Sequence, residues 1–463
     1  MRSLLLILLL CYTILALASK PLEKIDSLKL TLQKSEPTDK IEILIEIAEA
    51  YRFVNMKECY SYGLSAIKHA QEYNSLQLQA KALKSYAISN YFDANMNKAI
   101  EYTYRALYIF KELDDMEGLA ACYNNIGLFY EEKGELDSSL TNYMKSLKYE
   151  EIRGDNTGMA FSYFTLGNTY YYKDQLMLSL DYYFKSLEII KNSDNNEMKA
   201  VLYNAIGVIY EDSKEYDQAL QYYNNAEDIF LQLGDDENLA RVYMNKGELF
   251  SLENKNYKIS LKYFNKALDL KNKTGDKTGI ALAYNNLGHL YCFMEDYNTA
   301  LNYLKKSLTL YLELDSKYGI AMVEYNLGKL YNEIGKPKMA LNHLNSSLKL
   351  ADEYGLYDYK MPVYEELLEI YAVKLPNNKN FTNYFKLYLS YKDSIIDNLR
   401  YSKIKEIETK FDVSKLVQDA DKLKRENEEK DKHIYQLKML FMLISGVLIF
   451  IFLIYIFFFK NKS

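Results

Sequence analysis

The sequence predicts an all-α protein in which helical hairpins stack side by side into a solenoid. The first observation is a small residue that recurs about every 40 positions along the 463-residue chain. It stands at Ala48, Ala87, Gly127, Gly167, Gly207, Gly247, Gly288 and Gly328, with a weaker match at Leu368. The second observation is the composition, with 49% hydrophobic and 26% charged residues and only 5 Pro and 18 Gly. Such a composition is typical of buried helical material and not of a disordered chain.

Two further small residues in each unit predict two helices per unit. The first lies about twelve positions after the recurring small residue, at Ala99, Ser139, Ser179, Ala219, Ser260, Ala300 and Ala340. The second lies seven positions later, at Ala106, Ser146, Ser186, Ala226, Ala267, Ser307 and Ser347. Small side chains let two helices approach closely. Each unit is therefore predicted to be helix A, a short turn and helix B. A single hairpin cannot bury its apolar face alone, so the hairpins must stack into a right-handed solenoid.

This pattern resembles the tetratricopeptide repeat family. The family's order of a large residue, Leu-Gly, Tyr, then Ala, an aromatic residue and Ala is matched clearly in six units and loosely in nine, over residues 41–375. The usual unit of about 34 residues is lengthened here, and the family's Pro after helix B is replaced by pairs such as Gly154-Asp155, Gly234-Asp235 and Gly275-Asp276. The resemblance implies a long-repeat branch whose members are peptide- and protein-binding scaffolds.

The two ends of the chain predict export and a membrane anchor. Residues 1–18 combine Arg2, an apolar run and the small residues Ala16 and Ala18, which indicates a signal peptide; an uncleaved anchor is the alternative. Residues 439–459 carry no charged side chain and are long enough to cross a bilayer, which predicts a transmembrane helix before a cytoplasmic tail, 460–463. We therefore expect a single-pass membrane protein with its repeats on the extracytoplasmic (periplasmic) side and its carboxyl terminus in the cytoplasm.

Between these ends we expect a solenoid over 19–398, capped by its last helix, 381–398. One long charged helix is expected to follow over 399–438. Apolar residues at alternating spacings of three and four over 413–437 suit a coiled coil in a parallel homodimer, and a lone solvated helix explains them equally well. The order of segments is similar to the sensory half of bacterial tetratricopeptide-containing histidine kinases and regulators. In those families an effector domain follows the span, so we expect any signalling here to need a separate partner.

The resemblance implies that the inner face of helix A lines a concave ligand groove. The positions two before and one after the recurring small residue supply the candidate ligand residues, Asn125, Asn168, Asn245, Asn286, His289, Asn326 and Lys329. An amide donates and accepts at once, which suits the backbone of an extended peptide; a consensus role in the repeat is the alternative. Acidic residues nearby favour a basic or neutral ligand, unless they only form a solvated face: Glu131, Glu132, Glu211, Asp212, Glu248 and Glu333.

The sequence favours binding over catalysis. The four His residues are scattered without metal-ligand spacing, and no Gly-rich phosphate loop is present, so we expect no enzyme activity, no cofactor and no metal. The net charge of -6 gives no electrostatic basis for binding nucleic acid. We expect a membrane-anchored scaffold that binds a protein or peptide in its groove. The alternative is a sensor subunit that relays ligand binding to a separate cytoplasmic histidine kinase or transcriptional regulator.

Overall fold

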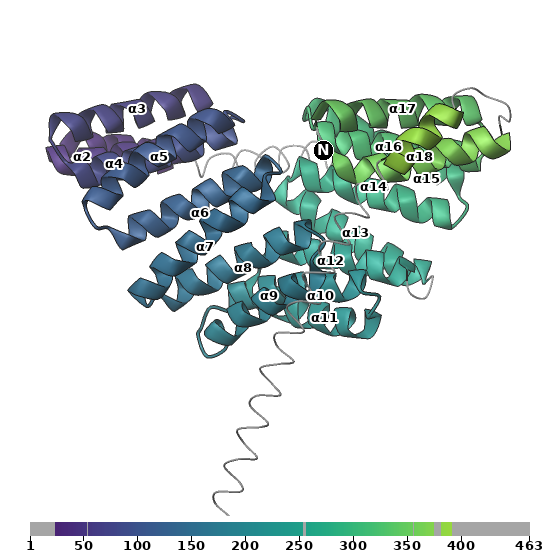
Figure 1. Cartoon of the computed structure of the whole chain (residues 1–463), viewed down its shortest axis with the longest axis horizontal. Helices are drawn as coiled ribbons and strands as arrows, with labels where there is room; N and C mark the ends of the chain where they lie inside the picture. The colour runs from purple at the N-terminus through teal and green to yellow at the C-terminus, as the bar shows by residue number, and fades with distance from the viewer. Residues whose placement is uncertain (1–23, 53, 253–255, 355, 375–380, 391–463) are drawn as a thin grey trace, which may run out of the picture. The chain divides into compact units, whose positions relative to one another are not determined.

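The computed structural model describes residues 24–390 except 53, 253–255, 355 and 375–380. It separates two units, Met1–Phe381 and Thr382–Ser463, and the described residues of the first are helices joined by short turns (Figure 1). After a helix over 24–34, the A helices are α2 (Pro37–Tyr51), α4 (Leu76–Phe92), α6 (Met116–Glu132), α8 (Asn156–Tyr172), α10 (Asn196–Asp212), α12 (Asp236–Leu252), α14 (Lys277–Phe293), α16 (Lys317–Glu333) and α18 (Tyr357–Glu369). The B helices are α3 (Met56–Glu72), α5 (Met96–Glu112), α7 (Leu136–Arg153), α9 (Leu176–Ile190), α11 (Tyr216–Leu233), α13 (Tyr257–Thr274), α15 (Tyr297–Glu313) and α17 (Pro337–Tyr354). A π-helical turn, η1 (Ile370–Lys374), follows α18.

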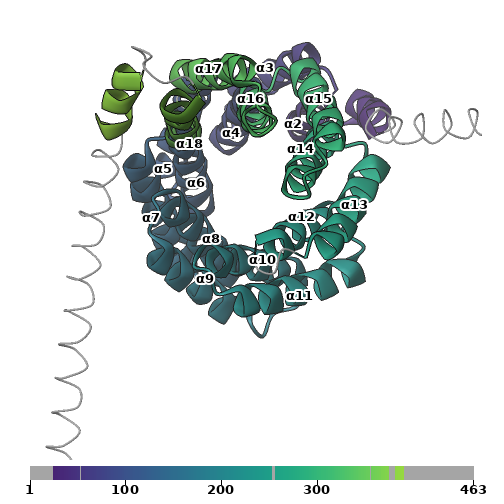
Figure 2. The same ribbon diagram turned by 90° about the vertical axis from the view of Figure 1, so that its right-hand side faces the viewer.

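The predicted all-α solenoid of hairpins is confirmed for the described residues, which contain no β-strand. Each helix A packs against the helix B that follows it, and each helix B packs against the next helix A. Figure 2 shows α4, α6, α8, α10, α12, α14 and α16 along the inside of the curved stack, with α7, α9, α11, α13, α15 and α17 outside them. The arrangement therefore gives every helix A an inner face.

The recurring glycine is needed because a side chain from helix B lies directly against it. A Cβ atom added to Gly167 would lie 2.5 Å from the ring of Tyr183, and one added to Gly207 would lie 2.6 Å from the ring of Tyr223. Both distances are well below van der Waals contact, so a side chain at either glycine would push the two helices apart. The neighbours of the equivalent glycines are Tyr143, Phe264, Leu304 and Leu344.

Hydrogen bonds from serine add a polar contact between the two helices of a hairpin. In four repeats the last of the three small residues is Ser, and its Oγ donates to the backbone carbonyl 26 positions earlier in helix A. The pairs are Ser146 with Ala120 (2.9 Å), Ser186 with Ala160 (2.7 Å), Ser307 with Ala281 (2.7 Å) and Ser347 with Ala321 (2.8 Å). A buried hydroxyl is thus satisfied without a partner side chain, which keeps the helices close.

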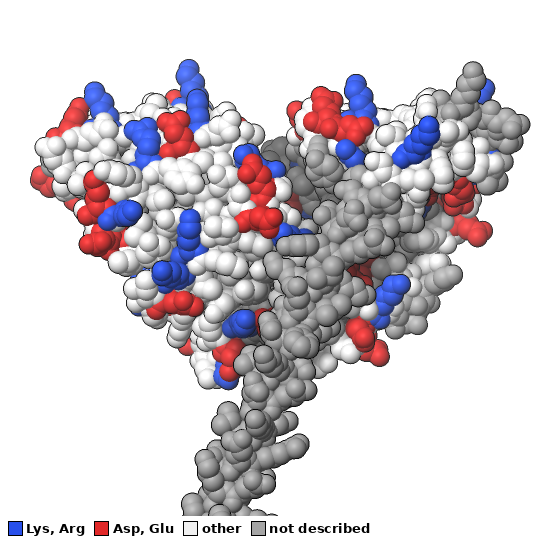
Figure 3. Space-filling view, in the orientation of Figure 1, with Lys and Arg blue, Asp and Glu red and all other residues white. Residues whose placement is uncertain are grey.

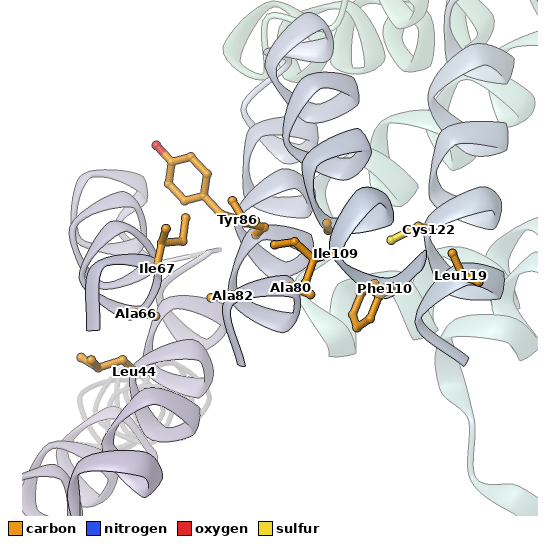
Figure 4. Packing of buried hydrophobic residues seen from close by; sticks show 12 residues of the cluster. Leu44, Ala66, Ile67, Ala80, Ala82, Tyr86, Ile109, Phe110, Leu119 and Cys122 are labelled. Atoms are coloured by element: carbon orange, nitrogen blue, oxygen red, sulfur yellow. The ribbon is translucent and has the colours of Figure 1, made fainter. Parts of the chain in front are cut away.

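The hydrophobic core runs as a seam through consecutive helices. Its first part joins Leu44 of α2 to Cys122 of α6 through buried residues of α3, α4 and α5, as the sticks in Figure 4 show. Tyr86 and Phe110 are the largest side chains of this cluster and fill the space between the hairpins. Neighbouring hairpins therefore share one continuous core, as expected of a solenoid.

In each Gly-Asp pair that replaces the family's proline, the Gly caps the end of one helix and the Asp caps the start of the next. Gly154 ends α7 with φ of +66°, in the left-handed region that favours glycine. Asp155 then begins α8, and its Oδ1 accepts hydrogen bonds from the backbone N–H groups of Thr157 and Gly158. Two residues thus end one helix and start the next, which leaves no room for a longer linker.

The longer spacing after Gly247 is explained by the turn between α12 and α13. Four residues separate these helices, whereas three separate α10 from α11. The helices themselves keep their lengths of 17 and 18 residues. The extra residue therefore lies in the turn and leaves the helix packing unchanged.

One interface between hairpins holds a buried ion pair in place of two apolar residues. In other repeats a Leu of helix B packs near the apolar residue that precedes the recurring glycine of the next helix A, as Leu147 does near Leu166. The same positions of α11 and α12 hold Glu227 and Lys246. Lys246 is 2% exposed, and its Nζ pairs with Glu227 and donates to Asn224 Oδ1 at 2.7 Å. Glu227 and Lys246 replace two apolar residues at the same interface, so neither charge is buried without a partner.

The predicted membrane localisation, single-pass with extracytoplasmic repeats, is contradicted. A helix needs about 20 consecutive apolar residues to cross a bilayer, and within the described residues none is both long enough and apolar enough. The described helices have polar residues on one side, as a packed solenoid requires. The predicted signal peptide, charged helix, coiled-coil segment 413–437 and span 439–459 lie outside the described residues, and of the predicted capping helix 381–398 the described part, 381–390, is helical.

A first prediction concerns the contact between Gly167 and Tyr183. We expect Gly167→Ala to lower the free energy of unfolding by about 1–3 kcal/mol, because the added methyl group overlaps the ring. In a Tyr183→Thr background the same change should cost almost nothing. The equivalent positions of the second repeat already hold Ala87 and Thr103, both fully buried. Urea unfolding of the four proteins measures the coupling, and equal costs in the two backgrounds would contradict this account.

A second prediction concerns the ion pair of Lys246 and Glu227. Lys246→Leu and Glu227→Leu should each destabilise the protein by about 3–5 kcal/mol, because each leaves one buried charge without its partner. The double variant restores the apolar pair of the other repeats, so its stability should equal or exceed that of the natural protein. Thermal unfolding of all four proteins tests this expectation. If the two costs simply add in the double variant, the buried pair is not what couples these hairpins.

Candidate functional site on the inner helical face

The A helices carry the candidate site on the side that faces the inside of the solenoid (Figure 2). The helical period places four positions on that side: six and two before the recurring small residue, and one and five after it. We call the side chains at these four positions of α4 to α16 the inner face. We include in it the side chain at the position four after the recurring small residue, which adjoins them. Most consecutive A helices contact each other directly, and the Thr169–Glu131 hydrogen bond joins α8 to α6, so the side chains of neighbouring repeats adjoin on this face.

The structure places all seven candidate ligand residues on this face. Each one is half-buried, so each is partly held by the protein and partly accessible. Asn125 belongs to α6, Asn168 to α8, Asn245 to α12, Asn286 and His289 to α14, and Asn326 and Lys329 to α16. The residues therefore extend over several repeats and do not form one compact cluster.

The asparagines connect neighbouring repeats. Asn245 Nδ2 donates to Asn204 Oδ1 of the preceding helix A at 2.9 Å, and Asn326 Nδ2 donates to Asn285 Oδ1 at 2.8 Å. Asn168 Oδ1 accepts from the Tyr183 hydroxyl at 2.7 Å. An amide has further donor and acceptor capacity beyond one bond. The sequence analysis did not identify Asn204 and Asn285, although an Asn three before the small residue was the available signal.

His289 and Asn286 lie at the same small cavity between α12 and α14. Its volume is about 40 Å³, and Glu248, Leu252, Phe264 and Phe293 are among its other lining residues. The His289 ring lies 4.5 Å from the Phe293 ring. Burial, helped by the positive charge of Lys329, lowers the pKa of His289 to about 4. The imidazole is therefore neutral at physiological pH and offers one donor and one acceptor.

Lys329, the other candidate next to a recurring glycine, is held by the inner face itself. Its Nζ lies 3.9 Å from Glu366 of α18 and 5.7 Å from the centre of the Tyr325 ring. The ammonium group is thus shared between a carboxylate and an aromatic face. Lys329 offsets negative charge at the carboxyl-terminal end of the inner face.

Glu211 is a strongly perturbed carboxyl group of the inner face. The Tyr223 hydroxyl donates to its Oε2 at 2.6 Å, while its Oε1 is buried and has no hydrogen-bond partner. Burial, together with the negative charges of Glu248 and Asp212, raises the pKa of Glu211 to about 8 against the opposing effect of the Tyr223 hydrogen bond. An acceptor atom of this kind is costly to bury, so the site favours an incoming donor or cation.

Large apolar side chains on the inner face were missed by the sequence analysis. Five of them are at least 41% exposed: Phe92 (48%), Phe161 (45%), Tyr172 (61%), Leu252 (49%) and Phe293 (41%). Four of the five occupy the position five after the recurring small residue. That shared position was visible in the sequence, but only the solvent exposure of the side chains distinguishes it from a packing position.

Two larger cavities lie away from the inner face. One of about 760 Å³ is lined mainly by α9, with Tyr163 and Tyr203, and one of about 570 Å³ is lined by α4 and α5. Charged side chains at their edges already pair, as Lys185 does with Asp181 at 2.7 Å. Figure 3 shows positive and negative side chains interspersed over the described surface that faces the viewer. These cavities therefore have no unsatisfied group comparable to Glu211.

Comparison with protein families supports the interpretation of the repeats. Two models, both described as tetratricopeptide repeat, match the sequence. One matches residues 120–152, and the other matches four overlapping segments, 158–232, 198–273, 238–313 and 279–353. No curated protein matches the chain.

Solved structures share the fold at low sequence identity. The apo form of the quorum sensor NprR from B. thuringiensis has a TM-score of 0.53 at 15% identity, covering 71% of this chain and 97% of that one. A Rap protein complexed with Competence and Sporulation Factor has a TM-score of 0.52 at 14% identity, covering 78% and 99%. The Rap conjugation gene regulator of plasmid pLS20, in complex with the Phr* peptide, has a TM-score of 0.51 at 16% identity, covering 73% and 96%. Similarity at this level establishes the fold alone.

The raised pKa of Glu211 predicts a dependence of stability on pH. A carboxyl group with a pKa of about 8 in the folded state, against 4.5 ordinarily, favours folding below pH 4.5, and this contribution is lost as the pH rises to about 8. We therefore expect Glu211→Gln, which can still accept from Tyr223, to raise the melting temperature more at pH 9 than at pH 5. Thermal unfolding measures the difference. Glu188→Gln on the outer helix α9, 69% exposed, is the control and should show no such trend.

Proposed function

Because this chain is a tetratricopeptide-repeat protein, we propose that its solenoid binds an extended protein segment or a peptide along the inner face, and that binding rather than catalysis is its role. The observation that carries this proposal is the series of exposed apolar side chains on the inner face of α4, α8, α12 and α14, from Phe92 to Phe293. Clustered apolar exposure of this kind marks a surface that another molecule covers.

The amides of the inner face supply the polar part of the proposed contact. An extended peptide presents backbone N–H and C=O groups along its whole length. The seven candidate residues, Asn125, Asn168, Asn245, Asn286, His289, Asn326 and Lys329, offer donors and acceptors to these groups in the proposed complex. The amides that bridge repeats are also fixed in place, which reduces the conformational entropy that binding would cost.

Solved structures of the same fold support the proposal by analogy. Two of them are described as complexes, one with Competence and Sporulation Factor and one with the Phr* peptide. A solenoid of this type can therefore hold a separate factor or a peptide. The identity of the ligand does not transfer to this chain, because a likeness at 14–16% identity establishes the fold alone.

Site-specific photocrosslinking tests the proposal. A benzoylphenylalanine residue would replace Tyr172 on the inner face or Ile152 on the outer helix α7, which are 61% and 60% exposed. We expect a crosslinked protein or peptide at position 172 and none of it at position 152, identified by mass spectrometry from cells that express the full chain. Equal products at both positions, or products at 152 alone, would contradict an inner-face site.

The contribution of the amides is tested in the same experiment. Asn286→Ala leaves both inter-repeat bonds, Asn204 to Asn245 and Asn285 to Asn326, in place. We expect it to reduce the crosslink yield at position 172 several-fold while leaving the melting temperature nearly unchanged, because an exposed hydrogen-bonding group contributes about 1 kcal/mol to binding. An unchanged yield would remove Asn286 from the proposed site.

A further inference from the structure

Aromatic and acidic pairs alternate along the inner face of four consecutive repeats. The positions four and five after the recurring small residue hold Tyr91-Phe92 in α4, Glu131-Glu132 in α6, Tyr171-Tyr172 in α8 and Glu211-Asp212 in α10. The period of this pattern is two repeats, so it is separate from the packing pattern, which repeats in every unit. Because the pattern does not follow the one-repeat period of the packing residues, we attribute it to binding and not to stability of the fold.

Hydroxyl groups of the protein hold each acidic pair in place. The Tyr91 hydroxyl donates to Glu132 Oε1 at 3.1 Å, and the Thr169 hydroxyl donates to Glu131 Oε2 at 2.6 Å. In the second acidic pair, Tyr171 bonds to Asp212 and Tyr223 to Glu211. The carboxylates are therefore fixed in position by neutral donors from neighbouring helices.

No Lys or Arg of the described residues forms an ion pair with these four carboxyl groups. Among the residues that the structure describes, Lys and Arg form many ion pairs, such as Lys173 with Asp137 at 2.5 Å, yet none includes either acidic pair. Glu211 also keeps one buried oxygen without any donor. Carboxylates without a counter-charge are unfavourable in the free protein, where Glu211 holds a proton instead of a charge, and a bound cation would favour the charged form.

We propose, building on the function proposed above, that the bound segment is basic and that its Arg or Lys side chains reach the two acidic pairs while its apolar side chains pack on Phe92 and Tyr172. The planar guanidinium group of arginine suits this arrangement best. It forms paired hydrogen bonds with a carboxylate and stacks on the aromatic rings that flank each acidic pair.

Three synthetic peptides test the proposal with the full-length chain. In the first, arginine alternates with phenylalanine and leucine; in the second, citrulline replaces each arginine; in the third, glutamate does. Citrulline keeps the shape of arginine and removes its charge. We expect the arginine peptide to bind at least about tenfold more tightly than the citrulline peptide, and the glutamate peptide not to bind, as measured by fluorescence anisotropy.

Matched variants assign the effect to the acidic pairs. Glu211→Gln with Asp212→Asn removes two ionisable carboxyl groups from the inner face, whereas Asp181→Asn with Glu188→Gln removes two from the outer helix α9. The first double variant should weaken binding of the arginine peptide at least about tenfold and leave the citrulline peptide unaffected. The second should change neither affinity beyond a small effect of net charge.

A proton-release measurement provides an independent readout. Glu211 holds a proton in the free protein at neutral pH because burial raises its pKa to about 8. Binding of the arginine peptide should release that proton, which calorimetry in two buffers of different ionisation enthalpy detects. The release should be absent in the Glu211→Gln variant.

The outcomes separate this inference from the proposed function. Equal affinities for the arginine and citrulline peptides, or an arginine affinity unchanged by the inner-face double variant, would overturn the inference and leave a peptide-binding face intact. If none of the three peptides binds, the inference is also overturned. The proposed function is then judged by whether benzoylphenylalanine at position 172 yields crosslinked products.

Discussion

The packing of every hairpin depends on the close approach of helix A to helix B. Where a Tyr, Phe or Leu of helix B lies against a glycine, as Tyr183 does against Gly167, a methyl group has no space. This contact sets the separation of the two helices, and the serine bond to a carbonyl 26 positions earlier fixes their alignment. Because the contact uses the side of helix A that points toward helix B, the opposite side is left free of packing. The inner face exists for that reason.

The interfaces between hairpins are more varied than the hairpins themselves. Each interface joins only two neighbours in a solenoid, so one can change its chemistry without affecting the others. One interface is bridged by Lys246 and Glu227, two carry amide pairs such as Asn204 with Asn245, and others are joined by a hydroxyl and a carboxylate, as in Thr169 with Glu131. A charged or amide pair is satisfied only when the correct hairpins meet. Such pairs therefore favour one order of stacking over a shifted one.

The inner face carries features that do not serve stability. Glu211 has an unpartnered buried oxygen, and large apolar side chains such as Tyr172 remain in water. Both are unfavourable for the free protein, and both are groups that a ligand would satisfy. Natural proteins accept local instability where binding requires a prepared surface. These exposed apolar and unsatisfied polar groups on the inner face are the strongest physical support for a binding role.

The sequence by itself determined the repeat, its helix pairs and the strip that faces inward, because these follow from local periodicity and the size of single residues. It did not determine which side chains meet across repeats. The pairing of Glu227 with Lys246 joins residues 19 positions apart, and that of Asn204 with Asn245 joins residues 41 apart. Both depend on the angle between hairpins, which no local pattern encodes. The predicted membrane localisation is contradicted, because none of the described helices is long and apolar enough to cross a bilayer. Only the tertiary structure decided which inner-face groups are exposed, partnered or left unsatisfied.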